Sequence, residues 1–247
     1  MLKVAMVDNI ELKLSEAVAY YWRTRLAQTK RQKESGRSDH GLRGAVTGGA
    51  QMDGFIKLLR DIVCAAGIDS GHIYHDTALE LPGFFRPTKK WDLLVVRDGQ
   101  LLAAFEVKSQ GGPSFGNNFN NRIEEAIGTA SDLWTAYREG AFKRGLRPWL
   151  GYFFLLEDCD GSRKPVKSNE PHFKVFPEFV DASYARRYEI FCQKLIRERH
   201  YDAASLVLSG PETGLKGVYL EPTEELGFRR LATLLSEHIR AGKKLSP

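Results

Sequence analysis

The sequence predicts an α/β fold in which a central mixed β-sheet is flanked by helices. Three observations lead to this prediction. The run WLGYFFLLE, at residues 149–157, is continuously apolar and short, which is typical of a strand buried on both faces. Two further apolar, β-rich runs flank the dipeptide Asp98-Gly99, which is favoured in hairpin turns. Segments with the 3.6-residue periodicity of amphipathic helices lie before the hairpin and between it and residue 149.

Two helices are expected before the hairpin. The first covers residues 10–33 and ends in the basic run TKRQK. The glycine-rich, partly basic segment 34–49 has two readings, a mobile linker or a loop that closes over a bound polyanion. The second helix covers about residues 51–66 and stops at Gly67. A short strand near residues 72–79 would follow it.

A third helix, from residue 121 to about residue 139, follows the hairpin and stops at Gly140. The remaining sequence shows no strong boundary, so we expect one domain over residues 1–247. Its parts are an N-terminal helix and loop at 1–50, a core at about 51–157 and a C-terminal elaboration at 158–247. The elements expected in the elaboration are helices near 184–199 and 223–241 and short strands at SLVLS and GVYLE.

Composition narrows the class of protein. The hydrophobic share of 43% is enough for a sizeable core, and the net charge of +5 is compatible with a polyanionic partner such as nucleic acid. The three cysteines are far apart and the histidines lack zinc-binding spacing, so a disulfide scaffold and a structural zinc are not expected. Charged residues interrupt the N-terminal apolar residues, and no apolar run is long enough to cross a bilayer. We therefore expect a cytoplasmic protein that does not bind membranes.

The hairpin carries the residues with the clearest chemistry. Side chains alternate along a strand, so Glu106 and Lys108 share one face. Asp92 lies on the preceding strand, almost as far before the Asp98-Gly99 turn as Glu106 is after it. A regular two-residue turn would place the two acids on opposite faces, whereas an odd loop or a bulge would place them together. We predict the second arrangement.

Two carboxylates at this range repel each other unless a cation lies between them. Oxygen ligands of this kind suit Mg²⁺, which neutralises charge on a phosphodiester and lowers the pKa of its bound water. A neighbouring lysine can orient the attacking water or stabilise the reacting phosphate. The set Asp92, Glu106 and Lys108 therefore indicates a metal-dependent phosphodiesterase. The alternative is an exposed strand face on which these side chains are merely solvated.

The order of elements favours the catalytic interpretation. Helix, three strands, helix and strand, with the acids and the lysine on the middle hairpin, resembles the core of the PD-(D/E)xK nucleases, a restriction-endonuclease-like αβββαβ fold. The sequence departs from that pattern at Trp91, where the motif has proline.

Two longer stretches resemble one family within that group. KSQGGPSFGNNFNNRIEEA, at 108–126, and RGAVTGGAQMDGF, at 43–55, are similar to the XhoI family of type II restriction endonucleases. The resemblance implies a Mg²⁺-dependent homodimer that cuts double-stranded DNA at the palindrome CTCGAG, after the first C, with 5′ overhangs. It also implies a cognate DNA methyltransferase in the same system, a functional rather than a physical partner.

The resemblance also implies roles for single residues. Asp92 and Glu106 match the metal-binding acids and Lys108 matches the catalytic lysine, with the main-chain carbonyl of Val107 as a further metal ligand. Relatives often add an acid from the first core helix, for which Asp53 is the candidate. Because aspartate is also a preferred N-cap, a purely structural role for Asp53 stays open.

Several polar residues near the hairpin are candidates for contact with DNA. Asn121 and Glu124 resemble a capping box, which gives them a structural role at the start of the third helix. At least one of Asn117, Asn118, Asn120 and Arg122 is expected to contact DNA, because asparagine reads adenine in the major groove. Candidates for contact with the DNA backbone are Lys89, Lys90, Ser109 and Gln110.

Three other functions stay open. One is a different nuclease on the same core, for repair or for a particular DNA structure. The second is a sequence-specific DNA-binding protein without cleavage. The third is an α/β protein in which the acids only decorate the surface. Discrete fragments from a plasmid digest distinguish the first from a restriction enzyme, and metal-dependent cutting distinguishes the second.

Overall fold

The computed structural model describes residues 9–34, 49–143 and 145–245. Most of the glycine-rich segment that was expected to be a linker or a closing loop lies outside these residues. Within them, no helix combines the length and the hydropathy that a bilayer-spanning segment needs. The division of the chain into one domain with a core at 51–157 stays a prediction.

A five-stranded mixed sheet forms the centre of the molecule, as predicted, in the order β1-β4-β5-β6-β7. The first three strands in this order are antiparallel, and β5, β6 and β7 are parallel to one another. The predicted strand at 149–157 is β6, which pairs on both sides and whose side chains are almost all buried. The strands are β1 (Ile73–Tyr74), β4 (Leu93–Arg97), β5 (Gln100–Gln110), β6 (Trp149–Glu157) and β7 (Ala203–Ser209).

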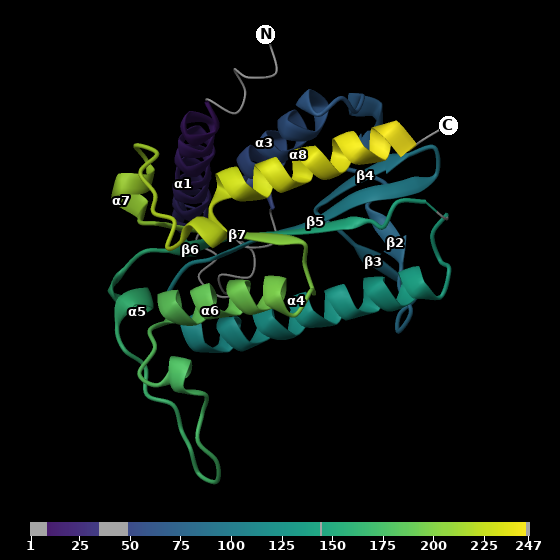
Figure 1. Ribbon diagram of the computed structural model, residues 1–247. Helices are drawn as coiled ribbons and strands as arrows, with labels where there is room; N and C mark the ends of the chain where they lie inside the picture. The colour runs from purple at the N-terminus through teal and green to yellow at the C-terminus, as the bar shows by residue number, and fades with distance from the viewer. Residues whose placement is uncertain (1–8, 35–48, 144, 246–247) are drawn as a thin grey trace.

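Helices cover both faces of this sheet, so two separate apolar cores form (Figure 1). One face packs against α1 (Ile10–Glu34), α3 (Asp53–Ala65) and α8 (Phe228–Leu245). The other face packs against α4 (Phe115–Arg138) and α6 (Tyr184–Arg197). Strand alternation divides the side chains between the two, and the face toward α4 and α6 carries the predicted catalytic residues.

The β4–β5 hairpin contains the predicted bulge. Val96 pairs with Leu101, but the next β4 residue, Val95, pairs with Ala103, so Leu102 is one residue too many on β5. Beyond the bulge Leu93 pairs with Phe105, which places the preceding residue of β4 opposite the residue after Phe105. The extra residue therefore brings the acids of the two strands to one face.

Helix α4 begins six residues earlier than predicted, at Phe115. Phe115 and Phe119 are buried and pack against tyrosines of α6, which extends the helix into the glycine- and asparagine-rich stretch. Asn121 is then an exposed residue inside the helix, so its predicted capping box with Glu124 is wrong.

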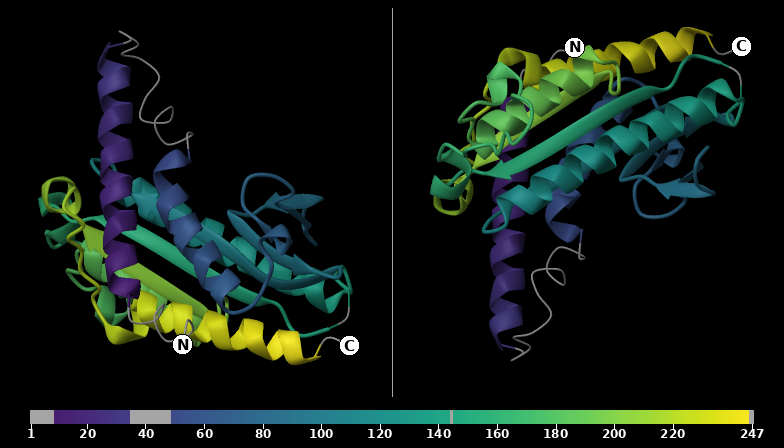
Figure 2. Two further views of the ribbon diagram at one scale, coloured as in Figure 1. Left: turned by 90° about the horizontal axis from the view of Figure 1, so that it is seen from above. Right: turned by 90° about the horizontal axis from the view of Figure 1, so that it is seen from below.

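A second, two-stranded sheet was not expected from the sequence. It consists of β2 (Glu80–Pro82) and β3 (Thr88–Lys90), and stands apart from the main sheet in Figure 2. The predicted strand at 217–221 is reduced to a single bridge between Leu220 and Leu208. The short helical elements are η1 (Ala50–Met52), η2 (Ser70–His72), α5 (Asp160–Arg163), η3 (Pro177–Phe179), α7 (Pro211–Gly214) and η4 (Glu224–Leu226).

Candidate active site

The three residues predicted to be catalytic lie together at one end of the hairpin. The Lys108 ammonium Nζ is 2.8 Å from Asp92 Oδ2 and 2.7 Å from Glu106 Oε2. Asp92 precedes β4, whereas Glu106 and Lys108 are on β5, so the bulge is what makes this contact possible. Both carboxylates thus converge on one position that a cation can occupy.

The main chain fixes the Asp92 carboxylate. The Asp92 amide donates to the carbonyl of Phe105 at 3.1 Å, and the Val107 amide donates to Asp92 Oδ2 at 2.8 Å. The N–H and C=O of one strand residue point to the same side. The Val107 carbonyl therefore faces the side on which Asp92 lies, where it is suited to join the two carboxylates as a ligand.

Charge in the site is balanced by two lysines. Lys89, on β3, places its Nζ 2.5 Å from Glu106 Oε1, so this buried carboxylate has an ammonium on each oxygen. Burial opposes the charge on Lys108, but the carboxylates of Glu106 and Asp92 raise its pKa above the ordinary lysine range. Lys108 is therefore a cation that donates hydrogen bonds.

The donor set fits a hard divalent cation. No group of three or more His, Cys, Asp or Glu side chains able to hold a metal occurs in the part of the chain that the structure describes. A metal at Asp92 and Glu106 would thus depend on two carboxylates, a carbonyl, water and phosphate oxygens. Mg²⁺ is commonly bound in this way, through one or two carboxylates with several waters.

The site opens into a cleft of about 620 Å³. One wall comes from the β2–β3 sheet and the turn that joins its strands, the floor is the β5 face, and the other wall is α4. The residues that line it are Phe85, Arg86, Lys89, Glu106, Lys108, Arg122, Glu124, Glu125, Gly128, Thr129 and Asp132.

The predicted DNA-contacting residues divide by position. Lys89 and Arg122 line the cleft, and Lys90, next to Lys89 on β3, is exposed. Asn117, Asn118 and Asn120 lie on the first two turns of α4 and do not line the cleft. Asn117 and Asn120 are exposed, and Asn118 is half-buried.

Two further candidates on β5 differ in their surroundings. Ser109 is half-buried and, by strand alternation, faces away from Lys108 toward α1 and α3. Gln110 is buried, donates to the carbonyl of Phe115 at 3.1 Å and accepts from the hydroxyl of Tyr188. The geometry therefore gives Gln110 a structural role, joining the end of β5 to the start of α4 and to α6.

Asp53 does not join the catalytic residues. It is the exposed first residue of α3 and lines a different cavity, of about 730 Å³, between α1 and α3. Burial raises the pKa of Asp53, and the Asp76 carboxylate raises it further, whereas His75 lowers it. His75 is 3.1 Å from Asp76, so it forms an ion pair when protonated and no metal site.

The sequence gave little sign of the residues on the cleft walls. Glu124 and Glu125 were interpreted as capping or solvated residues, yet both line the cleft, and Glu125 pairs with Arg122. Asp132 was not singled out at all, although it is buried and holds the turn of the β2–β3 sheet. A charged residue on the otherwise apolar face of a helix was the available signal.

Known proteins resemble this chain over most of its length. The family model described as restriction endonuclease XhoI matches residues 31–221, which include the hairpin and the cleft. The chain belongs to the XhoI family of restriction endonucleases. It is thus a type II restriction endonuclease, an enzyme class that cleaves DNA at specific sites and generally needs divalent metal ions.

Three curated relatives are about half identical. The chain is 51% identical to the type II restriction enzyme BstVI of Geobacillus stearothermophilus over 84% of this chain and 95% of that enzyme. It is 49% identical to the type II restriction enzyme XhoI of Xanthomonas vasicola over 72% of each. It is 52% identical to the type II restriction enzyme AbrI of Azospirillum brasilense over 67% of this chain and 75% of that enzyme. No solved structure matches the chain.

Proposed function

We propose that this enzyme hydrolyses double-stranded DNA at the palindrome CTCGAG, after the first C, with Mg²⁺ as the cofactor and 5′ overhangs as the product. The observation that carries the chemistry is the convergence of Asp92 and Glu106 on the ammonium of Lys108, 2.8 and 2.7 Å away. The target sequence rests on the family resemblance alone. We expect the enzyme to act in the cytoplasm.

The side chains divide the work as follows. Asp92 and Glu106, with the Val107 carbonyl, would hold the metal, which when bound neutralises charge on the phosphate and lowers the pKa of its water. Lys108 orients the attacking water and stabilises the charge that develops on the phosphate oxygens. Lys89, which pairs with Glu106, releases that carboxylate oxygen when a metal binds and is then able to contact the DNA backbone.

Cations around the cleft would position the duplex. Lys89, Lys90 and Arg122 supply charge next to the catalytic residues. Asn117, Asn118 and Asn120 are candidates for DNA contact farther along α4, and Ser109 is a candidate from the end of β5. Phosphate contacts by lysine and arginine release counterions, so binding without metal should weaken steeply as salt rises.

A palindromic target favours a homodimer, because a two-fold symmetric protein presents one active site to each strand. A cell that makes such an enzyme also needs a DNA methyltransferase that protects the same site. We propose both on the family resemblance.

A digest of sequenced plasmid DNA, with Mg²⁺ and with EDTA, tests the proposal. We expect cuts only at CTCGAG and only with Mg²⁺, with four-base 5′ overhangs when the ends are sequenced. Specific cuts at another sequence would keep the mechanism and overturn the target. Metal-independent cutting, or binding without cutting, would overturn the assignment of the catalytic residues.

A further inference from the structure

The β2–β3 sheet is a narrow ribbon that ends beside the catalytic residues. Its strands pair from Glu80 with Lys90 to Pro82 with Thr88, and five residues, 83–87, form the turn. At the base, Leu81 and Trp91 are buried in the α4 core. The ribbon is thus anchored at one end and free at its turn, which projects beside the cleft (Figure 2).

The turn exposes two aromatic side chains. Phe84 is 51% and Phe85 is 74% exposed, and their rings meet edge to face with centroids 5.0 Å apart. Phe85 lines the cleft that also contains Glu106 and Lys108. A pair of exposed rings at a catalytic cleft indicates a surface that binds something.

A buried carboxylate holds this turn in place. Asp132 on α4 accepts hydrogen bonds from the amides of Phe84, at 2.7 Å, and Phe85, at 2.8 Å. Its other oxygen pairs with Arg86 Nε at 2.7 Å. Burial raises the pKa of Asp132, but these partners outweigh burial and the net pKa is lowered. The rings are therefore presented on a backbone that is already ordered before any ligand binds.

Gly83 shows how closely the turn is fitted to this carboxylate. A Cβ at this position would lie 2.6 Å from Asp132 Oδ2 and 2.7 Å from the carbonyl of Arg86. Only glycine leaves the space for the turn to close around the Asp132 oxygens. The exposure of the two rings is thus built into the turn and does not result from a loose loop.

We propose that the β2–β3 ribbon enters the major groove of the target duplex and that Phe85, supported by Phe84, contacts the methyl group of a thymine in the recognition site. This inference rests on the proposed function. The major groove, about 12 Å wide, admits a two-stranded ribbon, whereas the minor groove is about half that width. Phenylalanine in the major groove recognises the thymine methyl through apolar contact.

Charge on the ribbon fits the same occupant. Arg86 follows the rings, and Lys89 and Lys90 lie on the returning strand, so cations line the ribbon where DNA phosphates flank the groove. No acidic residue lies between Gly83 and Lys90. An apolar tip between cations suits a groove whose floor carries a methyl group and whose edges carry phosphates.

Uracil in place of thymine tests this contact, because it removes only the methyl group. Single-turnover cleavage is measured on two duplexes that differ only in the thymines of the recognition site. We expect the wild-type enzyme to cut the uracil duplex about fourfold more slowly, the factor expected for losing one buried methyl group. The Phe85→Ala enzyme should cut the thymine duplex more slowly and no longer distinguish the two, whereas Phe85→Leu should retain part of the preference.

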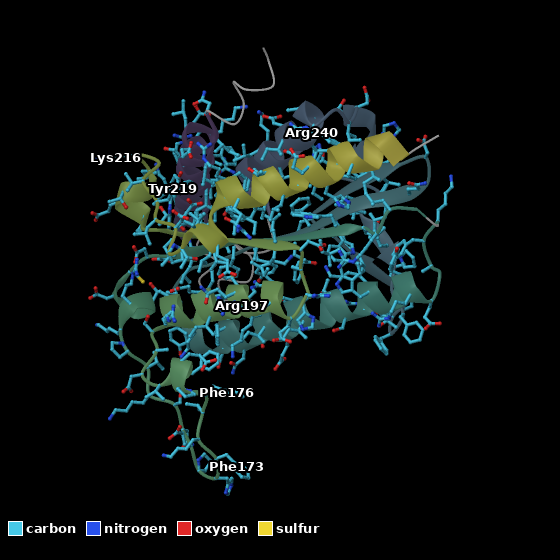
Figure 3. The ribbon with its side chains drawn as sticks, viewed as in Figure 1. Phe173, Phe176, Arg197, Lys216, Tyr219 and Arg240 are labelled. Atoms are coloured by element: carbon cyan, nitrogen blue, oxygen red, sulfur yellow. The ribbon has the colours of Figure 1, made fainter. Side chains whose placement is uncertain are left out.

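Phe173→Ala is the matched control. Phe173 is 88% exposed at the tip of a loop that projects from the opposite end of α6 (Figure 3), so this variant should keep the wild-type preference. Equal cutting of both duplexes by the wild type, or an unchanged preference in Phe85→Ala, would overturn the inference and leave the proposed function intact. Fluorescence anisotropy with Ca²⁺ measures the same preference in binding. A wild-type protein that neither cuts nor binds the thymine duplex would overturn both.

Discussion

Lys108 is the residue whose replacement tests the active site most directly. Lys108→Met keeps the aliphatic stem and removes the ammonium that lies 2.7 Å from Glu106 and 2.8 Å from Asp92. We expect cleavage to be lost, because no other group in the site can take over the same contacts. Binding of DNA in the absence of metal should persist, because Lys89, Lys90 and Arg122 remain to contact phosphates.

The same substitution should lower stability by an amount that the geometry limits. A hydrogen bond to a charged group contributes about 1.5–3 kcal/mol, and breaking a fully buried ion pair costs about 3–5 kcal/mol. Glu106 keeps Lys89 as a partner, and the Asp92 side chain is 33% exposed to solvent. We therefore expect a loss of about 2 kcal/mol, which lowers Tm by roughly 4–8 °C in a chain of this size.

Mg²⁺ should reverse part of this loss, because a cation between the carboxylates replaces the missing ammonium and binds only the folded state. Urea unfolding in EDTA and in Mg²⁺ measures the difference. The control, Lys174→Met, breaks a surface pair with Glu170, and its effect should stay below about 0.5 kcal/mol. Wild-type cleavage by Lys108→Met, or unchanged stability in EDTA, would refute this account of the site.

Three further substitutions probe different parts of the molecule. Glu106→Gln should reduce cleavage by a factor on the order of a hundred or more while leaving metal-free DNA binding, measured by anisotropy. Asp132→Asn should lower the free energy of unfolding by about 1–3 kcal/mol and weaken the preference for thymine over uracil, because the turn loses a charged acceptor. Burial lowers the pKa of His238, so the folded state binds its proton less readily than the unfolded state does. Stability should therefore fall as pH drops below about 6.5, and His238→Gln should reduce this fall in urea unfolding measured at a series of pH values.

The sequence predicted the site better than it predicted the site's surroundings. The alternation of β5 and the count of residues around Asp98-Gly99 were enough to require a bulge if Asp92 and Glu106 act together. The structure places that bulge at Leu102. This inference succeeded because strand parity is a local property, set by the order of residues within one hairpin.

The start of α4 was misplaced for a reason that lies elsewhere in the chain. Glycine and asparagine after Ser114 favour a loop by local propensity. Phe119 meets Tyr188 edge to face at 5.0 Å, and Phe115 stacks on Tyr184 at 5.8 Å. Packing against α6, about seventy residues later, thus outweighs the local preference, and a single sequence does not reveal it.

The β2–β3 turn was missed for a similar reason. Its conformation depends on Asp132, which follows Phe84 by 48 residues and lies on a different element. The stretch from Gly83 to Pro87 reads locally as an ordinary turn with two apolar residues. Its order comes from hydrogen bonds that cross between α4 and the ribbon, so only the three-dimensional structure shows that the rings are held in place.

The bulge at Leu102 also limits how this hairpin can change in length. Removing one residue between the Asp98-Gly99 turn and Phe105 would restore regular pairing and turn Glu106 and Lys108 away from Asp92. Adding a residue there would have the same effect, whereas changes in pairs would leave the acids on one face. The active site can therefore tolerate insertions and deletions in this hairpin only in even numbers, a constraint that substitutions at the same positions do not face.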